Sequence, residues 1–284
     1  MNRNLLITGG SGYLGSQLIR AAQRRGWRIY ATYHTHPFVP ERGTAVPLDL
    51  RDAERTRAVF RNIHPQAVIH AACSNRGEQA SAIVPAARSV ASAAREFGWR
   101  LVHISTDMVF DGEHAPYADN AAPSPIIDYG QAKAEAESVV SELCPAALIA
   151  RPSLIWGLGP VDHQTRWLVD GVKRREPVTL FTDERRSPVY VGDLCAALLE
   201  LADNGNIRGL MNLGGGQALS RWDFGQKLLN ALRLPAMPYL VPGTAKESGL
   251  IRPRDLTMIS GRAACLLKTK LRGVDEVLEG LRFL

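Results

Sequence analysis

The amino-acid sequence predicts an α/β fold in which a doubly wound parallel sheet carries helices on both faces. Three observations support this prediction. Short apolar segments alternate with amphipathic helical segments through the first half of the chain. A glycine-rich turn joins the first apolar segment to the first helical one. Beyond residue 152 the alternation loosens and prolines become frequent, which predicts a smaller C-terminal lobe interleaved with the sheet.

The glycine-rich turn spans residues 9–15, between a short apolar strand at 5–8 and a helix whose inner face carries Leu14, Leu18 and Ala22. A plain left-handed turn needs only one glycine. Repeated glycines let the backbone approach a pyrophosphate, which then rests on the helix N-terminus. The turn therefore predicts a Rossmann-type dinucleotide site. The expected cofactor-binding residues of this turn are Gly9, Ser11, Gly12, Tyr13, Leu14 and Gly15.

The end of the second expected strand, residues 27–33, indicates which dinucleotide is bound. A site that prefers NAD usually has an acidic residue there to hold the ribose 2′-hydroxyl. Here the strand is followed by His34, Thr35 and His36, without a carboxylate. This favours NADP(H) over NAD(H), with His34 as the expected contact. The alternative is that both histidines are plain loop residues.

Two further strand ends are expected to contact the dinucleotide. The apolar segment 45–48 is followed by Asp49 and Leu50, which are placed to meet the adenine. The segment 67–70 is followed by small residues that let the backbone pass close to the cofactor. The expected contacts after this segment are Ala71, Ala72 and Ser74. His70 itself lies in an apolar strand and is expected to be a core histidine rather than a ligand.

The catalytic residues are expected around Thr106, which follows the apolar strand 101–104. Tyr129 and Lys133 lie four residues apart near the start of a helix, so both side chains share one helical face. A hydroxyl at a strand end beside a Tyr/Lys pair suits proton transfer to a carbonyl oxygen. A free tyrosine has a pKa of about 10, and a nearby cation favours its phenolate. Thr106, Tyr129 and Lys133 are therefore the candidate catalytic residues.

Composition restricts the class of protein. The 284 residues are 45% hydrophobic and 22% charged, as in an ordinary globular protein with an ample core. The net charge of +6 is spread along the chain, and the longest basic run is 173–175. We therefore expect no nucleic-acid partner, although the charge suits an anionic substrate or cofactor.

The four cysteines are widely separated and show no Cys-x-x-Cys pair or His-spaced cluster. Reduced thiols are expected, with no metal site. No apolar run is long enough to cross a membrane, and the N-terminus does not have the pattern of a signal peptide. These features predict a cytoplasmic protein without a membrane partner.

The expected domain boundaries follow the loss of alternation. Residues 1–152, with about 187–214, are predicted to form the NAD(P)-binding domain. Residues 153–186 and 215–284 are predicted to form the substrate-binding lobe. Ala- and Ser-rich helical faces at about 86–97 and 129–142 permit a symmetric homodimer without requiring one.

Several segments together resemble the extended short-chain dehydrogenase/reductase superfamily and, within it, the dTDP-4-dehydrorhamnose reductase family. The resemblance covers nearly the whole chain. The matching segments are Thr8–Gly15, Ser105–Asp107 with Val109–Gly112, Tyr129–Lys133, Arg186–Pro188 with Val191–Leu194, and Arg252–Asp255.

The resemblance implies hydride transfer to a 4-keto carbon of a nucleotide-linked sugar, by an NAD(P)H-dependent oxidoreductase acting on CH-OH. Tyr129 would protonate the carbonyl oxygen, and Thr106 would hydrogen-bond the same oxygen. Lys133 would bind the nicotinamide ribose, and both Tyr129 and Lys133 are expected to contact the cofactor. The residues expected at the substrate are Asp107, Met108, Leu154 and Arg186. Arg186 is expected either to pair with a substrate phosphate or to form a surface ion pair, and Asp107 to touch substrate or to cap a turn.

The chain departs from the family at three places. Met108 stands where the family usually has Tyr, and Leu154 where it usually has Trp, so the expected sugar pocket is altered. Residues 83–85 lack the Asn that the superfamily commonly has there. Two alternatives remain open: a nucleotide-sugar epimerase of the same superfamily, and a cofactor-binding regulatory protein like the regulatory subunit of methionine adenosyltransferase. A dehydratase is disfavoured because Asp107 is not followed by Glu.

Overall fold

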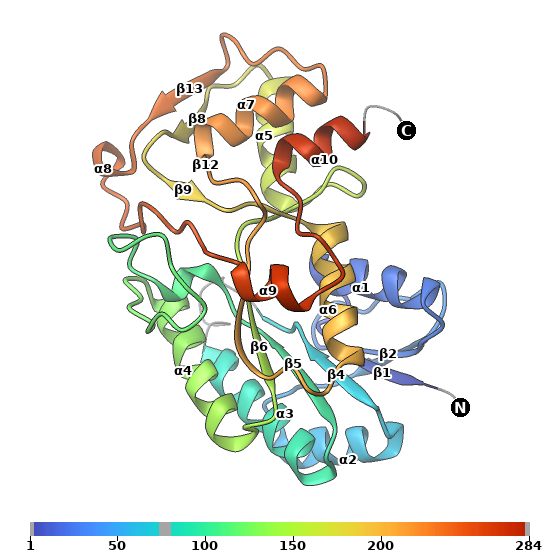
Figure 1. Cartoon of the computed structure of the whole chain (residues 1–284). Coiled ribbons are helices and arrows are strands. Elements are labelled where there is room, and N and C mark those ends of the chain that lie inside the picture. The colour runs from blue at the N-terminus through green and yellow to red at the C-terminus, as the bar shows by residue number, and fades with distance from the viewer. Residues whose placement is uncertain (1–2, 74–80, 282–284) are drawn as a thin grey trace.

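A seven-stranded parallel sheet forms the centre of the computed structural model, which describes residues 3–73 and 81–281 (Figure 1). The strand order is β11-β6-β5-β4-β1-β2-β3. The strands are β1 (Asn4–Thr8), β2 (Arg28–Tyr33), β3 (Thr44–Pro47), β4 (Ala67–His70), β5 (Arg100–Ile104), β6 (Leu148–Pro152) and β11 (Gly209–Leu213). The predicted α/β class with a doubly wound parallel sheet is confirmed.

Helices cover both faces of the sheet and enclose two hydrophobic cores. One face is covered by α1 (Tyr13–Arg24) and α6 (Val191–Asp203), together with α9 (Gly261–Leu266). The other face is covered by α2 (Ala53–Ile63), α3 (Ile83–Phe97) and α4 (Asp128–Leu143). The strands β1, β4 and β5 are buried almost throughout, which explains their continuous apolar composition.

Local chemistry explains several helix boundaries. The Asp52 carboxylate accepts a hydrogen bond from the backbone N–H of Arg55 and so caps the start of α2. Asp162 and Ser220 cap α5 (His163–Lys173) and α7 (Arg221–Ala231) in the same way. Gly98 ends α3 in the left-handed region at φ 68°, where glycine pays no Cβ penalty.

The C-terminal part of the chain packs as a smaller, irregular region above the carboxyl ends of the strands (Figure 1). Its helices are α5 (His163–Lys173), α7 (Arg221–Ala231), α8 (Ala245–Ser248) and α10 (Val274–Leu281). Its strand pairs are β7 (Ile155–Trp156) with β10 (Val189–Tyr190), β8 (Val178–Phe181) with β13 (Leu240–Gly243), and β9 (Arg185–Arg186) with β12 (Leu219–Ser220). Trp156, Phe224 and Leu240 are among the buried residues of its own hydrophobic core.

The chain crosses between these two regions more than once. After β6 it enters the C-terminal region, returns through α6 and β11 to the edge of the sheet, and leaves again. The interleaved arrangement follows from this path. The domain boundaries given above remain our proposal for how the two regions divide.

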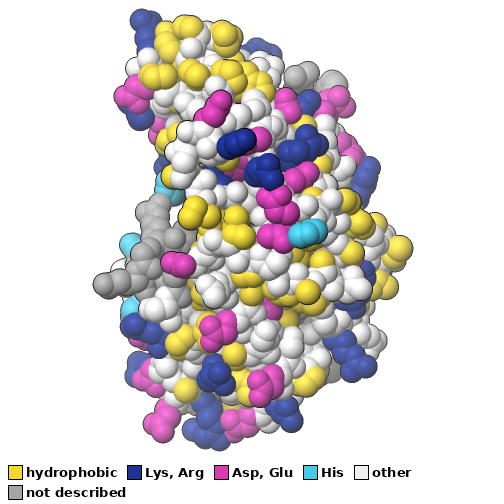
Figure 2. Space-filling view, turned by 90° about the vertical axis from the view of Figure 1, so that its left-hand side faces the viewer, with side chains coloured by type: hydrophobic (Ala, Val, Ile, Leu, Met, Phe, Trp, Pro, Cys, Tyr) yellow, Lys and Arg dark blue, Asp and Glu magenta, His cyan; other side chains and the backbone are white. Residues whose placement is uncertain are grey.

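No helix within residues 3–73 and 81–281 has the length and apolarity needed to cross a membrane. Figure 2 shows one face of the molecule, on which basic and acidic side chains are interspersed. Many exposed arginines are paired, such as Arg57 with Glu96 and Arg254 with Glu113. Many of the basic side chains on the surface are therefore offset by an acidic neighbour.

Candidate active site

The glycine turn is a close-packed corner between β1 and α1. Gly9 adopts φ +72°, and a Cβ on it would lie 2.7 Å from the Ala72 Cα atom. A Cβ on Gly15 would lie 2.1 Å from the Gly9 carbonyl oxygen. Ser11 and Gly12 are exposed at the rim of this turn. The arrangement brings the turn and the backbone after β4 together, as a dinucleotide site requires.

The remaining residues of the turn take part in packing. The Tyr13 hydroxyl donates to the Pro160 carbonyl at 3.1 Å, so α1 touches the loop before α5. Burial, followed by the Asp162 charge, raises the pKa of Tyr13. Leu14 packs against the core beneath α1.

A small charged cluster lies at the ends of β2 and β3. The Arg51 guanidinium binds the Asp49 carboxylate, with an Nη2–Oδ2 distance of 2.6 Å, and His34 Nε2 lies 3.6 Å from the same carboxylate. The hydrogen bond from Arg51 is the main cause that lowers the pKa of Asp49 to about 2. Leu50 is buried in the core. The structure thus brings the predicted residues His34 and Asp49 together. It adds Arg51 to this cluster. Arg51 was not predicted, although it is the basic residue nearest to Asp49 in the sequence.

The loop after β4 is fixed by a buried chain of hydrogen bonds. His70 Nδ1 is hydrogen-bonded with Thr8 Oγ1 at 2.7 Å, and the backbone N–H of Ala72 donates to the same hydroxyl at 3.1 Å. Burial lowers the pKa of His70 to about 3, so it stays neutral. The expectation of a core histidine is confirmed. Ala71 and Ala72 lie against the glycine turn, and the predicted contact Ser74 lies outside the described residues.

Thr106, Tyr129 and Lys133 meet at the carboxyl end of β5. The Lys133 Nζ atom donates to the Ile104 carbonyl at 2.5 Å and is buried. The Thr106 hydroxyl accepts from the backbone N–H of Met108 at 3.2 Å and donates to Asp107 Oδ1 at 3.4 Å. It also lies close enough to the Tyr129 phenol to lower the pKa of that group through a hydrogen bond. The structure therefore brings the three predicted catalytic residues together, with α4 facing the strand end.

Gly130 makes this approach possible. A Cβ at this position would lie 2.1 Å from the Met108 carbonyl oxygen, well inside contact distance. The first turn of α4 therefore rests directly on the backbone that follows Thr106. Only a residue without a side chain lets the helix sit this close.

The pKa of Tyr129 differs from the expectation. Burial is the main cause that raises the pKa well above 10, and the Cys73 thiol and Asp107 carboxylate add to it. The hydrogen bond from Thr106 opposes this rise. Lys133 does not produce the expected lowering, because the tyrosine is desolvated and the Lys133 ammonium donates to the Ile104 carbonyl.

Cys73 was not among the predicted site residues, yet its thiol lies 3.8 Å from the Tyr129 oxygen and donates to it. The side chain is exposed. The sequence did place Cys73 directly after the small residues that follow β4, and this position could have indicated that it belongs to the site.

Two buried ion pairs flank Thr106. On one side, Arg151 binds Glu137 through two hydrogen bonds of 2.8 and 2.6 Å, and the Ser105 hydroxyl donates to the same carboxylate at 2.5 Å. On the other side, Arg186 Nη1 donates to Asp107 Oδ1 at 2.9 Å. Neither pair was predicted. A charged residue at 151, following an apolar strand, was a signal for the first.

Asp107 and Arg186 are therefore buried and paired with each other, and their contact with substrate stays a prediction. Asp107 is buried and accepts a second hydrogen bond from the Ser153 hydroxyl at 2.7 Å, while the cap of the following 3₁₀ turn η2 (Asp107–Val109) is Thr106. Arg186 is also buried and binds Glu184 at 3.1 Å. An Arg186 surface ion pair is wrong, because both carboxylate partners are buried with it.

Met108 and Leu154 are half-buried in two different hydrophobic clusters. Met108 packs against the cluster that contains Phe110 and Tyr117, and Leu154 against the core of the C-terminal region. Both remain proposed substrate contacts.

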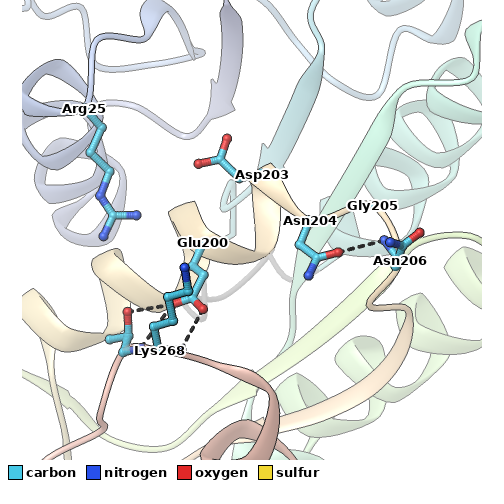
Figure 3. A pocket seen from close by; sticks show the side chains of 8 residues that line it. Arg25, Glu200, Asp203, Asn204, Gly205, Asn206 and Lys268 are labelled. Atoms are coloured by element: carbon cyan, nitrogen blue, oxygen red, sulfur yellow. Dashed lines mark hydrogen bonds between the residues drawn. The ribbon is translucent and has the colours of Figure 1, made fainter.

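A separate surface pocket of about 640 Å³ lies near the C-terminal ends of α1 and α6, lined by residues that include Arg25, Glu200, Asp203 and Lys268 (Figure 3). Because α1 starts at the glycine turn and runs back along the sheet, this pocket lies toward the amino ends of the strands. Glu200 is occupied there by the backbone N–H groups of Lys268 and Thr269. The pocket is therefore distinct from the candidate active site. Within the described ranges, no three His, Cys, Asp or Glu side chains gather as a metal ion would require.

Comparison with known proteins agrees with this geometry. Residues 3–279 match the family described as RmlD substrate binding domain. The chain belongs to this family. A dTDP-4-keto-6-deoxy-D-glucose reductase from Streptomyces niveus is 30% identical over 268 residues, which cover 89% of this chain and 88% of that protein. The dTDP-4-dehydrorhamnose reductase-like character predicted from the motifs is thereby confirmed.

Two further similarities span most of the chain. The methionine adenosyltransferase 2 subunit beta of Danio rerio is 26% identical over 264 residues, or 87% of this chain and 79% of that protein. The crystal structure of dTDP-4-dehydrorhamnose reductase from Bacillus anthracis in complex with NADP has a TM-score of 0.85 at 24% identity. It covers 100% of this chain and 99% of that chain. The last similarity supports the Rossmann-type reductase fold.

Proposed function

We propose that the protein is an NAD(P)H-dependent reductase of a nucleotide-linked 4-keto-sugar. The observation that carries this proposal is the meeting of Thr106, Tyr129 and Lys133 at the end of β5, beside a glycine turn that a Cβ would fill. Family membership and the likeness to the S. niveus reductase support the substrate class.

The residues of the glycine turn, with Ala71 and Ala72, fit a dinucleotide, and Lys133 would hold its nicotinamide ribose. When bound, the nicotinamide supplies the hydride. Tyr129 would donate its proton to the substrate carbonyl oxygen, and its raised pKa keeps that proton in place near neutral pH. Thr106 would donate a hydrogen bond to the same oxygen and orient it. A positioned proton donor contributes about 10²–10⁴-fold in rate.

We propose NADP(H) as the preferred cofactor. No carboxylate ends β2, and the Asp49 carboxylate from the neighbouring strand is neutralised by Arg51, with His34 beside it. Two basic side chains around one carboxylate suit the additional phosphate of NADP(H). The protein is proposed to act in the cytoplasm, and a homodimer remains an expectation.

The test is to titrate NADPH and NADH into the purified protein and to follow nicotinamide absorbance with a panel of nucleotide-linked 4-keto-sugars. Turnover is expected, and Tyr129→Phe should reduce kcat by about 10²–10⁴-fold. Tyr239→Phe is the matched control, because Tyr239 lies in the C-terminal hydrophobic core. Turnover that survives Tyr129→Phe would contradict the role of the tyrosine.

A second candidate function is supported by the likeness to the methionine adenosyltransferase subunit. A protein of that kind would bind cofactor and a partner enzyme without reducing a sugar. Cofactor binding without turnover on any substrate of the panel, together with stable co-purification of another enzyme, would favour it. Cofactor that is retained through purification and recycled during turnover would instead favour an epimerase.

A further inference from the structure

The Thr106 hydroxyl has a single proton and two neighbouring acceptors. One acceptor is the Tyr129 oxygen, to which Thr106 is hydrogen-bonded. The other is Asp107 Oδ1, to which the Thr106 hydroxyl donates a long hydrogen bond of 3.4 Å. A carboxylate is the stronger acceptor of the two, because hydrogen bonds to charged groups are shorter and stronger. Something must therefore weaken the attraction of Asp107 for this proton if Thr106 is to serve the substrate.

Arg186 meets this need. Its Nη1 atom donates to the same Oδ1 atom at 2.9 Å, which is 0.5 Å shorter than the contact from Thr106 (3.4 − 2.9). The second oxygen of Asp107 accepts from Ser153 at 2.7 Å. Both oxygens of the Asp107 carboxylate thus accept shorter hydrogen bonds than the one of 3.4 Å that Thr106 donates to Oδ1. The guanidinium also offsets its negative charge.

Arg186 is itself held in place from the other side. Its Nη2 atom donates to Glu184 at 3.1 Å, and Glu184 also receives Arg252 at 3.5 Å. Arg186 and Glu184 are both buried. The Arg186 guanidinium is consequently committed to two carboxylates of the protein, which leaves little of it for a substrate phosphate.

We propose that Arg186 is a positioning residue: by occupying Asp107 Oδ1, it directs the Thr106 proton toward the Tyr129 oxygen and the substrate carbonyl. It acts through Asp107 and Thr106 and does not touch the reacting atoms. Its role in turnover rests on the proposed function, whereas its effect on the Tyr129 hydroxyl does not.

Whether the loss of Arg186 raises or lowers the pKa of Tyr129 follows from the groups that face Tyr129 and Asp107. These groups are Cys73, Thr106, Lys133, Ser153, Glu184 and Arg186. Removing Arg186 leaves the Asp107 charge uncompensated and draws the Thr106 proton away from the phenol. Both changes disfavour the phenolate, so the pKa of Tyr129 must rise. Removing the Asp107 charge has the opposite effect.

The test labels the protein with difluorotyrosine, whose lower intrinsic pKa brings the titration into a range where the protein stays folded. The ¹⁹F resonance of residue 129 is assigned with Tyr129→Phe. We expect Arg186→Gln to titrate about one pH unit above the unsubstituted chain and Asp107→Asn to titrate below it. The double variant should follow Asp107→Asn, because Arg186 acts only through Asp107.

Arg252→Gln is the matched control, since Arg252 binds the same Glu184 and, among the described residues, forms no hydrogen bond or ion pair with Asp107. It should leave the Tyr129 titration in place. Arg186→Lys retains the charge and should recover part of the shift. In turnover, Arg186→Gln should lower kcat about tenfold with little change in KM.

An unshifted Tyr129 resonance in folded Arg186→Gln would overturn the proposal, as would a double variant in which the two shifts simply add. A wild-type chain that reduces no keto-sugar would contradict the proposed function alone, because the fluorine titration decides the role of Arg186 without turnover. If Arg186→Gln does not fold, Arg186→Lys and Asp107→Asn are used in its place. The proposal is overturned if Tyr129 titrates at the same pH in both variants as in the wild type.

Discussion

The two buried ion pairs that flank Thr106 differ in how fully each satisfies its groups. Arg151 and Glu137 form a two-bond pair with side-chain exposures of 0% and 5%. Arg151 also donates to the Asp119 and Ala121 carbonyls, and its guanidinium lies 5.0 Å from the Phe110 ring centre. The Asp107–Arg186 pair has a single bond, and the Arg186 Nε atom has no hydrogen-bond partner in the described structure.

This difference indicates that the Glu137–Arg151 pair has a structural role, whereas the Asp107–Arg186 pair can change its arrangement more easily. The Glu137–Arg151 pair joins α4 to β6 and holds Ser105, so it fixes the helix that carries Tyr129 and Lys133. The Asp107–Arg186 pair shares its arginine with Glu184 and leaves a donor unused. A buried polar network specifies one arrangement when it is fully satisfied, and it leaves latitude when it is not. Breaking each pair in turn tests this contrast.

The largest effect is expected from Glu137→Ala. The substitution leaves the buried Arg151 guanidinium without its carboxylate, which should lower the free energy of unfolding by about 3–5 kcal/mol. Denaturant unfolding followed by circular dichroism measures the change. Glu135→Ala, at an exposed position on the same helix, is the control and should change stability by less than about 0.5 kcal/mol. If Glu137→Ala and Glu135→Ala lowered stability equally, the Glu137–Arg151 pair would not have the structural role assigned to it.

A smaller effect on stability is expected from Asp107→Asn. Arg186 keeps Glu184 as a partner, and the amide oxygen can still accept from Ser153, so the loss should be about 1.5–3 kcal/mol. The same unfolding measurement applies. A loss as large as that of Glu137→Ala would show that the two pairs do not differ in the way proposed.

The smallest effect is expected from the exposed Asp49–Arg51 pair at the far end of the site. The pKa of Asp49 is lowered from 3.8 to about 2 in the folded protein. Its contribution is therefore present above pH 3.8 and is lost as the pH falls through about 2. The side chains are 32% and 53% exposed, so the contribution should stay below about 1 kcal/mol. Unfolding of Asp49→Asn and wild type, compared at pH 6 and pH 2, should differ only at the higher pH. If the two proteins differed more in stability at pH 2 than at pH 6, the Asp49 carboxylate would not have the stabilising role given to it here.

Sequence patterns were sufficient for the parts of the site that are local along the chain. The glycine turn, the strand that ends before Thr106 and the Tyr129/Lys133 spacing each depend on a few neighbouring residues, so their placement followed from strand and helix periodicity. The fold class followed in the same way. The position of β11 at the edge of the sheet confirms that the chain returns from the C-terminal region.

The polar partners could not be predicted because they join distant segments. Arg186 and Asp107 are 79 residues apart, and either had several chemically reasonable partners. Glu137 lies eight residues after Tyr129, on the same helical stripe as Lys133, but its position alone does not indicate Arg151. The raised pKa of Tyr129 had the same cause, since burial is a property of the assembled site.

The contact at Gly130 has a consequence for altering the substrate range of this protein. Because the helix rests on the Met108 backbone, the spacing between the Tyr129 phenol and the strand end is set by main-chain atoms, while the Met108 side chain packs against a separate hydrophobic cluster. The Met108 side chain, a proposed substrate contact, can therefore be exchanged without moving the first turn of α4, provided that residue 130 stays a glycine.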